Sequence, residues 1–176
     1  MLVRIMNMQR RKMETGRFYF VSDSFYERFK ECGLVDNKAE KNGEEHNRPC
    51  CYMFKFDNLP DDEIYWMIPI SSKIKKYQEE YQKSYQKYGV CDNISFGYVL
   101  GNKSAFLVQN LFPVTEKYVL NEYIDTNTKQ PITIPKKLMT ELHKKARKKI
   151  RFNQQGKRLG LSDTMKIYQE LRKDKK

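Results

Sequence analysis

A short polar stretch follows a predicted hydrophobic strand, and its side chains could bind a phosphate group. The strand covers residues 63–68 and ends at Pro69, and Ser71, Ser72 and Lys73 follow it. Hydroxyl and ammonium groups at the end of a strand can donate hydrogen bonds to phosphate oxygens. The same serines could instead cap the helix that the next residues predict. The stretch therefore has two interpretations, a phosphate site and a helix cap.

Most of the positive charge of the chain lies in its last quarter. The 176 residues have a formal net charge of +12, and residues 131–176 hold fifteen Lys and Arg against four Asp and Glu, a net charge of +11. A block of one sign attracts polyanions, so we expect a nucleic acid as the partner. The cations expected to contact it are Lys75, Lys76, Lys144, Lys145, Arg147, Lys148, Lys149, Arg151, Lys157 and Arg158.

The composition excludes several other classes of protein. With 39% hydrophobic and 32% charged residues, the chain can form a core and should fold as one domain. No uncharged run approaches the ~20 residues that a membrane span needs. None of the four cysteines has the Cys-x-x-Cys spacing of a zinc site, and no glycine-rich phosphate loop is present. We therefore expect a cytoplasmic protein that contacts no membrane and holds no metal or cofactor.

Strand and helix patterns alternate along the chain and predict an α+β domain. We expect a strongly bent antiparallel sheet or partial barrel with flanking helices, over residues 17–176, and a basic helical part at residues 131–176. Residues 1–16 are interpreted as a loose extension and residues 34–47 as a surface loop. The predicted strands are residues 18–21, 50–56, 63–68, 95–100, 104–108 and 118–124, and the predicted helices start near residues 22, 73, 135 and 163.

The order of four short motifs resembles a known family. The motifs are a Phe-Tyr-Phe-Val strand before a capped helix at residues 18–32, Arg48-Pro49 opening a strand, Pro69-Ile70-Ser71-Ser72-Lys73, and Asn110-Leu111-Phe112-Pro113-Val114. This order is similar to that of the type III toxin–antitoxin endoribonucleases, ToxN and AbiQ, and especially the CptN branch. The resemblance implies a fold like that of MazF and Kid toxins, metal-independent RNA cleavage, and inhibition by a pseudoknot RNA antitoxin.

The resemblance also implies a set of catalytic residues. The family motif Pro-Leu-Thr-Ser-Pro-Lys places Ser71 and Ser72 at its hydroxyl positions, and a shift of one residue places Lys73, rather than Lys75, at its lysine. The basic residue of the family falls on Arg48. Its tyrosine falls on Phe25 or, with a one-residue shift, on Tyr26, which has the hydroxyl. The implied catalytic set is Arg48, Ser71, Ser72, Lys73 and Tyr26.

These residues suit cleavage by the 2'-hydroxyl of RNA. Arg48 and Lys73 could stabilise the dianionic phosphorane, and Ser72 and Tyr26 could orient the nucleophile. We expect His46 to lie in a charged loop and His143 to be solvated or to face a phosphate. Substrate and antitoxin RNA are then the partners, and a closed cyclic assembly of protein and RNA is expected. The alternative is a non-catalytic basic RNA- or DNA-binding module, for which the basic segment alone would suffice.

Overall fold

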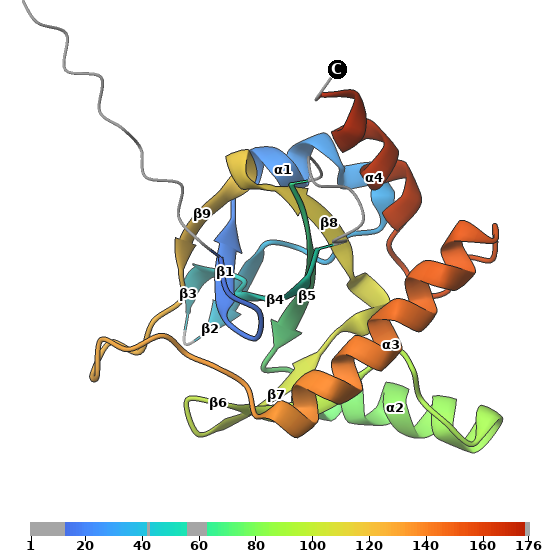
Figure 1. Ribbon diagram of the computed structural model, residues 1–176. Coiled ribbons are helices and arrows are strands. Elements are labelled where there is room, and N and C mark those ends of the chain that lie inside the picture. The colour runs from blue at the N-terminus through green and yellow to red at the C-terminus, as the bar shows by residue number, and fades with distance from the viewer. Residues whose placement is uncertain (1–12, 42, 56–62, 175–176) are drawn as a thin grey trace, which may run out of the picture.

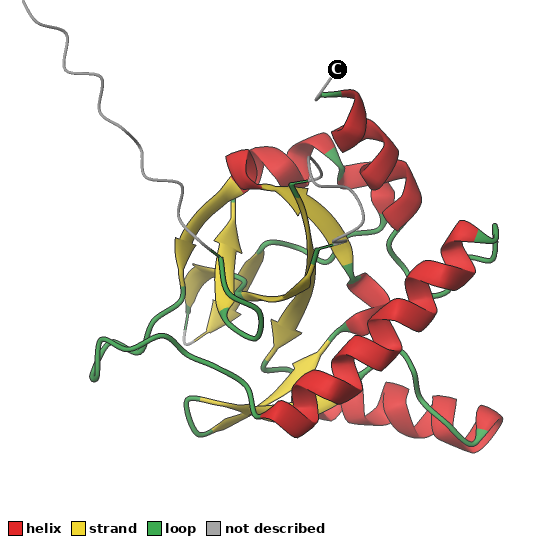
Figure 2. Ribbon diagram, viewed as in Figure 1, coloured by secondary structure: helices red, strands yellow, loops and turns green. Residues whose placement is uncertain are grey.

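A curved antiparallel sheet forms the centre of the molecule in the computed structural model, which describes residues 13–41, 43–55 and 63–174 (Figure 1). Six strands follow the order β6-β7-β5-β4-β1-β9, and β8 also pairs with β5. Within the described residues the sheet is not closed into a barrel, and helices flank it (Figure 2), which confirms the predicted α+β class. The strands are β1 Phe18–Val21, β4 Cys50–Phe54, β5 Ile64–Ser71, β6 Ser95–Val99, β7 Asn102–Phe106, β8 Phe112–Thr115 and β9 Val119–Glu122.

The long strand β5 connects the two parts of the sheet. One of its edges pairs with β4, and the other pairs first with β8 and then, at Ile70 and Ser71, with β7. Its side chains pack into two hydrophobic clusters, with Trp66 and Ile68 in one and Ile64 and Met67 in the other. Because apolar contacts fix the strand on both faces, the position of Ser71 at its end is well defined.

Four α-helices accompany the sheet in the described residues: α1 Asp23–Arg28, α2 Ile74–Tyr88, α3 Lys136–Gln154 and α4 Thr164–Lys173. The apolar edge predicted for α3 is buried against the sheet, and it consists of Leu138, Leu142, Ala146 and Ile150. The predicted cap of α4 is also confirmed, since the Asp163 side chain accepts a hydrogen bond from the backbone N–H of Lys166 at 3.2 Å.

A short hairpin lies in a segment that was predicted to have no strands. Residues 34–47, predicted as a surface loop, contain β2 Lys38–Lys41 paired with β3 Glu44–Asn47. The sequence of this hairpin is polar on both strands and lacks the alternation that marks a half-buried strand, so its composition is that of a loop. The β8 strand was also missed, because its short run contains Pro113.

The last residue of the extension predicted at residues 1–16 is hydrogen-bonded to the domain. The backbone N–H of Gly16 donates to the Tyr52 carbonyl at 2.8 Å, and the Gly16 carbonyl accepts from Ile134 at 3.2 Å. Residues 1–12 of that extension lie outside the described residues, as do residues 56–62, which contain the turn predicted between β4 and β5.

Candidate functional site

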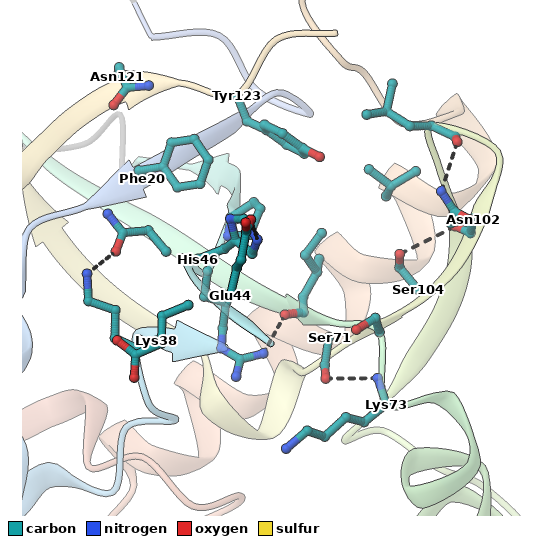
Figure 3. A pocket seen from close by; sticks show the side chains of 18 residues that line it. Phe20, Lys38, Glu44, His46, Ser71, Lys73, Asn102, Ser104, Asn121 and Tyr123 are labelled. Carbon is teal, nitrogen blue, oxygen red and sulfur yellow. Dashed lines mark hydrogen bonds and ion pairs between the residues drawn. The ribbon is translucent and has the colours of Figure 1, made fainter. Parts of the chain in front are cut away.

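A cleft of about 890 Å³ opens between β5 and the two hairpins (Figure 3). The β2–β3 hairpin forms one end of the cleft and the β6–β7 hairpin forms the other. Four of the five candidate catalytic residues line it, namely Arg48, Ser71, Ser72 and Lys73. The fold therefore brings together two segments that are more than twenty residues apart in the sequence.

Arg48 is held in one orientation by main-chain carbonyls. Its Nε donates to the Asp36 carbonyl and its Nη1 donates to the Ile70 carbonyl, each at 2.8 Å. The residue is only 6% exposed, and both acceptors are uncharged. A guanidinium has five N–H donors, so the group can still donate to an anion in the cleft.

Ser71, Ser72 and Lys73 form the bend from β5 into α2. The Ser71 hydroxyl is buried and accepts a hydrogen bond from the backbone N–H of Lys73 at 3.2 Å, so Ser71 does support the start of the helix. Lys73 itself is the N-cap residue, and its side chain makes no capping hydrogen bond. Ser72 and Lys73 are exposed in the cleft. The two interpretations of this stretch are thus compatible, since different residues serve each.

Two further lysines of this segment lie outside the cleft. Neither Lys75 nor Lys76 lines it, although both belong to the first turn of α2. Lys76 lies 3.9 Å from Glu80 on the helix surface. The geometry therefore favours Lys73 over Lys75 as the lysine of the site.

Tyr26 does not reach this cleft. Its ring packs against Phe25 and Phe112, and its hydroxyl lies 3.7 Å from the Cys50 sulfur. Burial raises the pKa of Tyr26 well above its ordinary value, and burial also raises the pKa of the Cys50 thiol to about 12. Tyr26 is therefore the one candidate catalytic residue that does not line the cleft.

Two aromatic residues of the cleft were missed in the sequence. Phe20 on β1 and Tyr123 just after β9 are in contact, with ring centroids 5.5 Å apart and planes at 66°. They lie across the cleft from Ser71 and Lys73 (Figure 3). Partly exposed rings in a cationic cleft are suited to stacking against unpaired bases. The signal available in the sequence was only that Phe20 is an aromatic residue in a predicted strand.

His46, expected in a loop, lies on β3 and lines the cleft. Its Nε2 is 3.7 Å from a carboxylate oxygen of Glu44. The expectation for His143 was wrong, because this ring packs edge-on against Phe54 and its Nε2 lies 2.7 Å from the Met53 carbonyl. His143 therefore serves the packing of α3 on β4.

Three of the basic residues of α3 bond within the protein. Lys149 is buried and donates to the carbonyls of Val108 and Gln109 and to the Ser162 hydroxyl. Burial lowers its pKa to about 7. Lys145 donates to the Ile94 carbonyl and Ser95 hydroxyl, and Lys148 pairs with Asp92. The exposed candidates on α3 and in the segment after it, all outside the cleft, are Lys144, Arg147, Arg151, Lys157 and Arg158.

In the described parts of the chain, no three His, Cys, Asp or Glu side chains are placed to hold a metal ion, and none of the helices could cross a membrane. Cys32, Cys50, Cys51 and Cys91 are buried free thiols.

Comparisons with known proteins give a clear match in fold. No family model and no curated protein matches the sequence. AbiQ, a lactococcal anti-phage endoribonuclease of the type III toxin–antitoxin system, superposes with a TM-score of 0.64 over 93% of this chain and 100% of its own, at 14% identity. A chain from a bacterial antiviral system that a processed non-coding RNA regulates has a TM-score of 0.60 over 89% of this chain and 97% of its own, at 17% identity. The chain therefore has the fold of AbiQ over most of its length.

Proposed function

We propose that the protein is an endoribonuclease toxin of a type III toxin–antitoxin system that acts in phage defence by abortive infection. The observation that carries this proposal is the cleft at the end of β5, where Arg48 and Lys73 lie with Ser71 and Ser72. The AbiQ-like fold supports it, because AbiQ is an endoribonuclease of such a system.

The proposed reaction needs no metal ion. Arg48 and Lys73 bind the oxygens of the scissile phosphate and stabilise the charge of the phosphorane. The Ser72 hydroxyl, which is exposed in the cleft, orients the 2'-hydroxyl. The 2'-oxygen bonds to phosphorus as its proton passes to water, the bond between phosphorus and the 5'-oxygen breaks, and that oxygen takes up a proton from water. The products carry a 2',3'-cyclic phosphate and a 5'-hydroxyl. Tyr26 is given no role in this scheme, because it does not line the cleft.

A non-catalytic RNA- or DNA-binding module is the second candidate. The exposed cations of α3 favour it, since they lie outside the cleft and would bind a nucleic acid without cleaving it. Incubation of the purified protein with total RNA in EDTA separates the two candidates. The endoribonuclease leaves discrete fragments, whereas a binding module leaves the RNA intact.

The proposed inhibitor is a pseudoknot RNA that covers the cleft and reaches the exposed face of α3. An RNA that spans the cleft of one protein and the α3 cations of the next would close the assembly into a ring, because a closed assembly satisfies every interface. Of the candidate cations on α3, Lys144, Arg147 and Arg151 are exposed, whereas Lys145, Lys148 and Lys149 bond within the protein, so the first three are the proposed contacts.

Replacing Lys144, Arg147 and Arg151 together by Gln should weaken antitoxin binding and reduce its salt dependence. Each lost phosphate contact lowers the slope of log K against log salt by about 0.7 to 0.9, so the slope should decrease by about 2 to 3. Cleavage of short RNAs should be kept. The control variant replaces Lys30, Lys83 and Lys87, which are exposed elsewhere, by Gln. An equal change of slope in both variants would mean that only net charge matters and that α3 is not a contact surface.

A further inference from the structure

The tip of the β6–β7 hairpin has a leucine in a backbone conformation that leucine rarely adopts. Val99 pairs with Asn102, so Leu100 and Gly101 form a two-residue turn, with φ angles of 50° and 75°. Two positive φ angles define the type I' hairpin turn, in which Asn-Gly is strongly preferred. Leucine in this conformation is strained by contact of its Cβ with the following carbonyl. Folding alone would favour asparagine at this position.

The base of the same hairpin is firmly anchored. The Ser95 hydroxyl donates to Glu141 at 2.6 Å, and Lys145 donates to the Ser95 hydroxyl at 2.9 Å. At Gly97 a Cβ atom would lie 2.3 Å from the Leu138 side chain, so the strand packs closely on α3. The anchored strands therefore fix the tip in relation to the rest of the cleft.

The strained leucine lies in the cleft instead of the core. Leu100 lines the cleft and is 43% exposed, while Phe20 and Tyr123 line the side opposite Ser71 and Lys73 (Figure 3). Neighbouring Asn102 donates to the Leu100 carbonyl at 3.1 Å, which helps to hold the turn. Residues held in such sparsely populated backbone conformations cluster at active sites and ligand-binding sites. Apolar and aromatic surfaces next to phosphate-binding cations match the flat face of an unpaired nucleobase.

We propose that Leu100 is a substrate-binding residue that contacts one unpaired base beside the scissile phosphate of the RNA. This inference rests on the proposed endoribonuclease function, and it goes beyond that function because it assigns base recognition to the β6–β7 hairpin. A bound RNA would have its phosphate near Arg48 and Lys73 and its base against Leu100.

The variant Leu100→Asn separates a role in binding from a role in folding. Asparagine is preferred in this turn, so the melting temperature should rise by about 1 to 4 °C. Loss of the contact with the base should lower kcat/KM for a short RNA by about 5- to 50-fold. The matched control is Lys129→Asn, which relieves a similar positive φ of 58° in the loop between β9 and α3, outside the cleft. This control should be more stable and should cleave RNA as the wild type does.

A set of short RNAs, each with one abasic nucleotide, identifies the contacted base. For the wild type, one abasic position next to the cut should reduce cleavage, and for Leu100→Asn the same position should reduce it less. Equal cleavage by Leu100→Asn and wild type, or an equal abasic effect in both, would overturn this inference alone. An absence of any cleavage by the wild type would overturn the proposed function and this inference with it.

Discussion

Replacing Lys73 by Ala should reduce RNA cleavage by about 10²- to 10³-fold and leave the free energy of unfolding unchanged. The side chain is exposed in the cleft and makes no capping bond, so its removal leaves no buried group without a partner. The loss in rate is that expected when one donor to a developing oxyanion is removed. Single-turnover cleavage and thermal denaturation of the same preparation measure both quantities.

Lys75→Ala is the matched control for this variant. It removes the same charge two residues further along, in the first turn of α2, but Lys75 does not line the cleft. We expect Lys75→Ala to cleave RNA within a few-fold of the wild type. If Lys75→Ala lost as much activity as Lys73→Ala, the site would depend on local charge and not on a placed ammonium group.

Replacing Arg48 by Ala should reduce RNA cleavage about as much as Lys73→Ala does. It should also destabilise the protein. The carbonyls of Asp36 and Ile70 lose their donor in the buried part of the site, which should cost about 1 to 3 kcal/mol of the free energy of unfolding. Arg48→Lys keeps the charge but cannot donate to both carbonyls and to a phosphate in the same planar arrangement.

We therefore expect Arg48→Lys to recover part of the activity and little of the stability. Urea denaturation and single-turnover rates of the two variants, compared with Lys73→Ala, test this difference. An Arg48→Ala variant with full activity would remove Arg48 from the site, and one with full stability would contradict the role of the two carbonyl bonds.

Local signals in the sequence predicted the individual elements well. Gly33 and Gly89 end helical segments in the left-handed conformation, as glycine at those positions predicts. The β2–β3 hairpin was missed because its pairing depends on cross-strand polar contacts, such as the bond of Lys38 to Asn47. Such contacts leave no hydrophobic pattern in the sequence.

The sequence predicted part of the candidate site. The family resemblance selected Arg48, Ser71, Ser72 and Lys73, and the structure brings these residues to one cleft. The resemblance does not determine in which direction a side chain on a short helix points. In the structure the Tyr26 hydroxyl contacts Cys50, and Tyr26 does not line the cleft. The same limit applies to α3, where the long stem of Lys149 allows its ammonium group to be buried among carbonyls.

A pair of short RNAs tests most directly whether the 2'-hydroxyl attacks the neighbouring phosphate in this cleft. The two RNAs are identical except for one 2'-deoxyribose at the cut, and both are incubated with the wild-type protein in EDTA. We predict that the all-ribose RNA is cut, with a 5'-hydroxyl on the downstream fragment, and that the substituted RNA stays intact at that position. Cleavage of the substituted RNA there, a 5'-phosphate on the product, or no cleavage of the all-ribose RNA would contradict this mechanism.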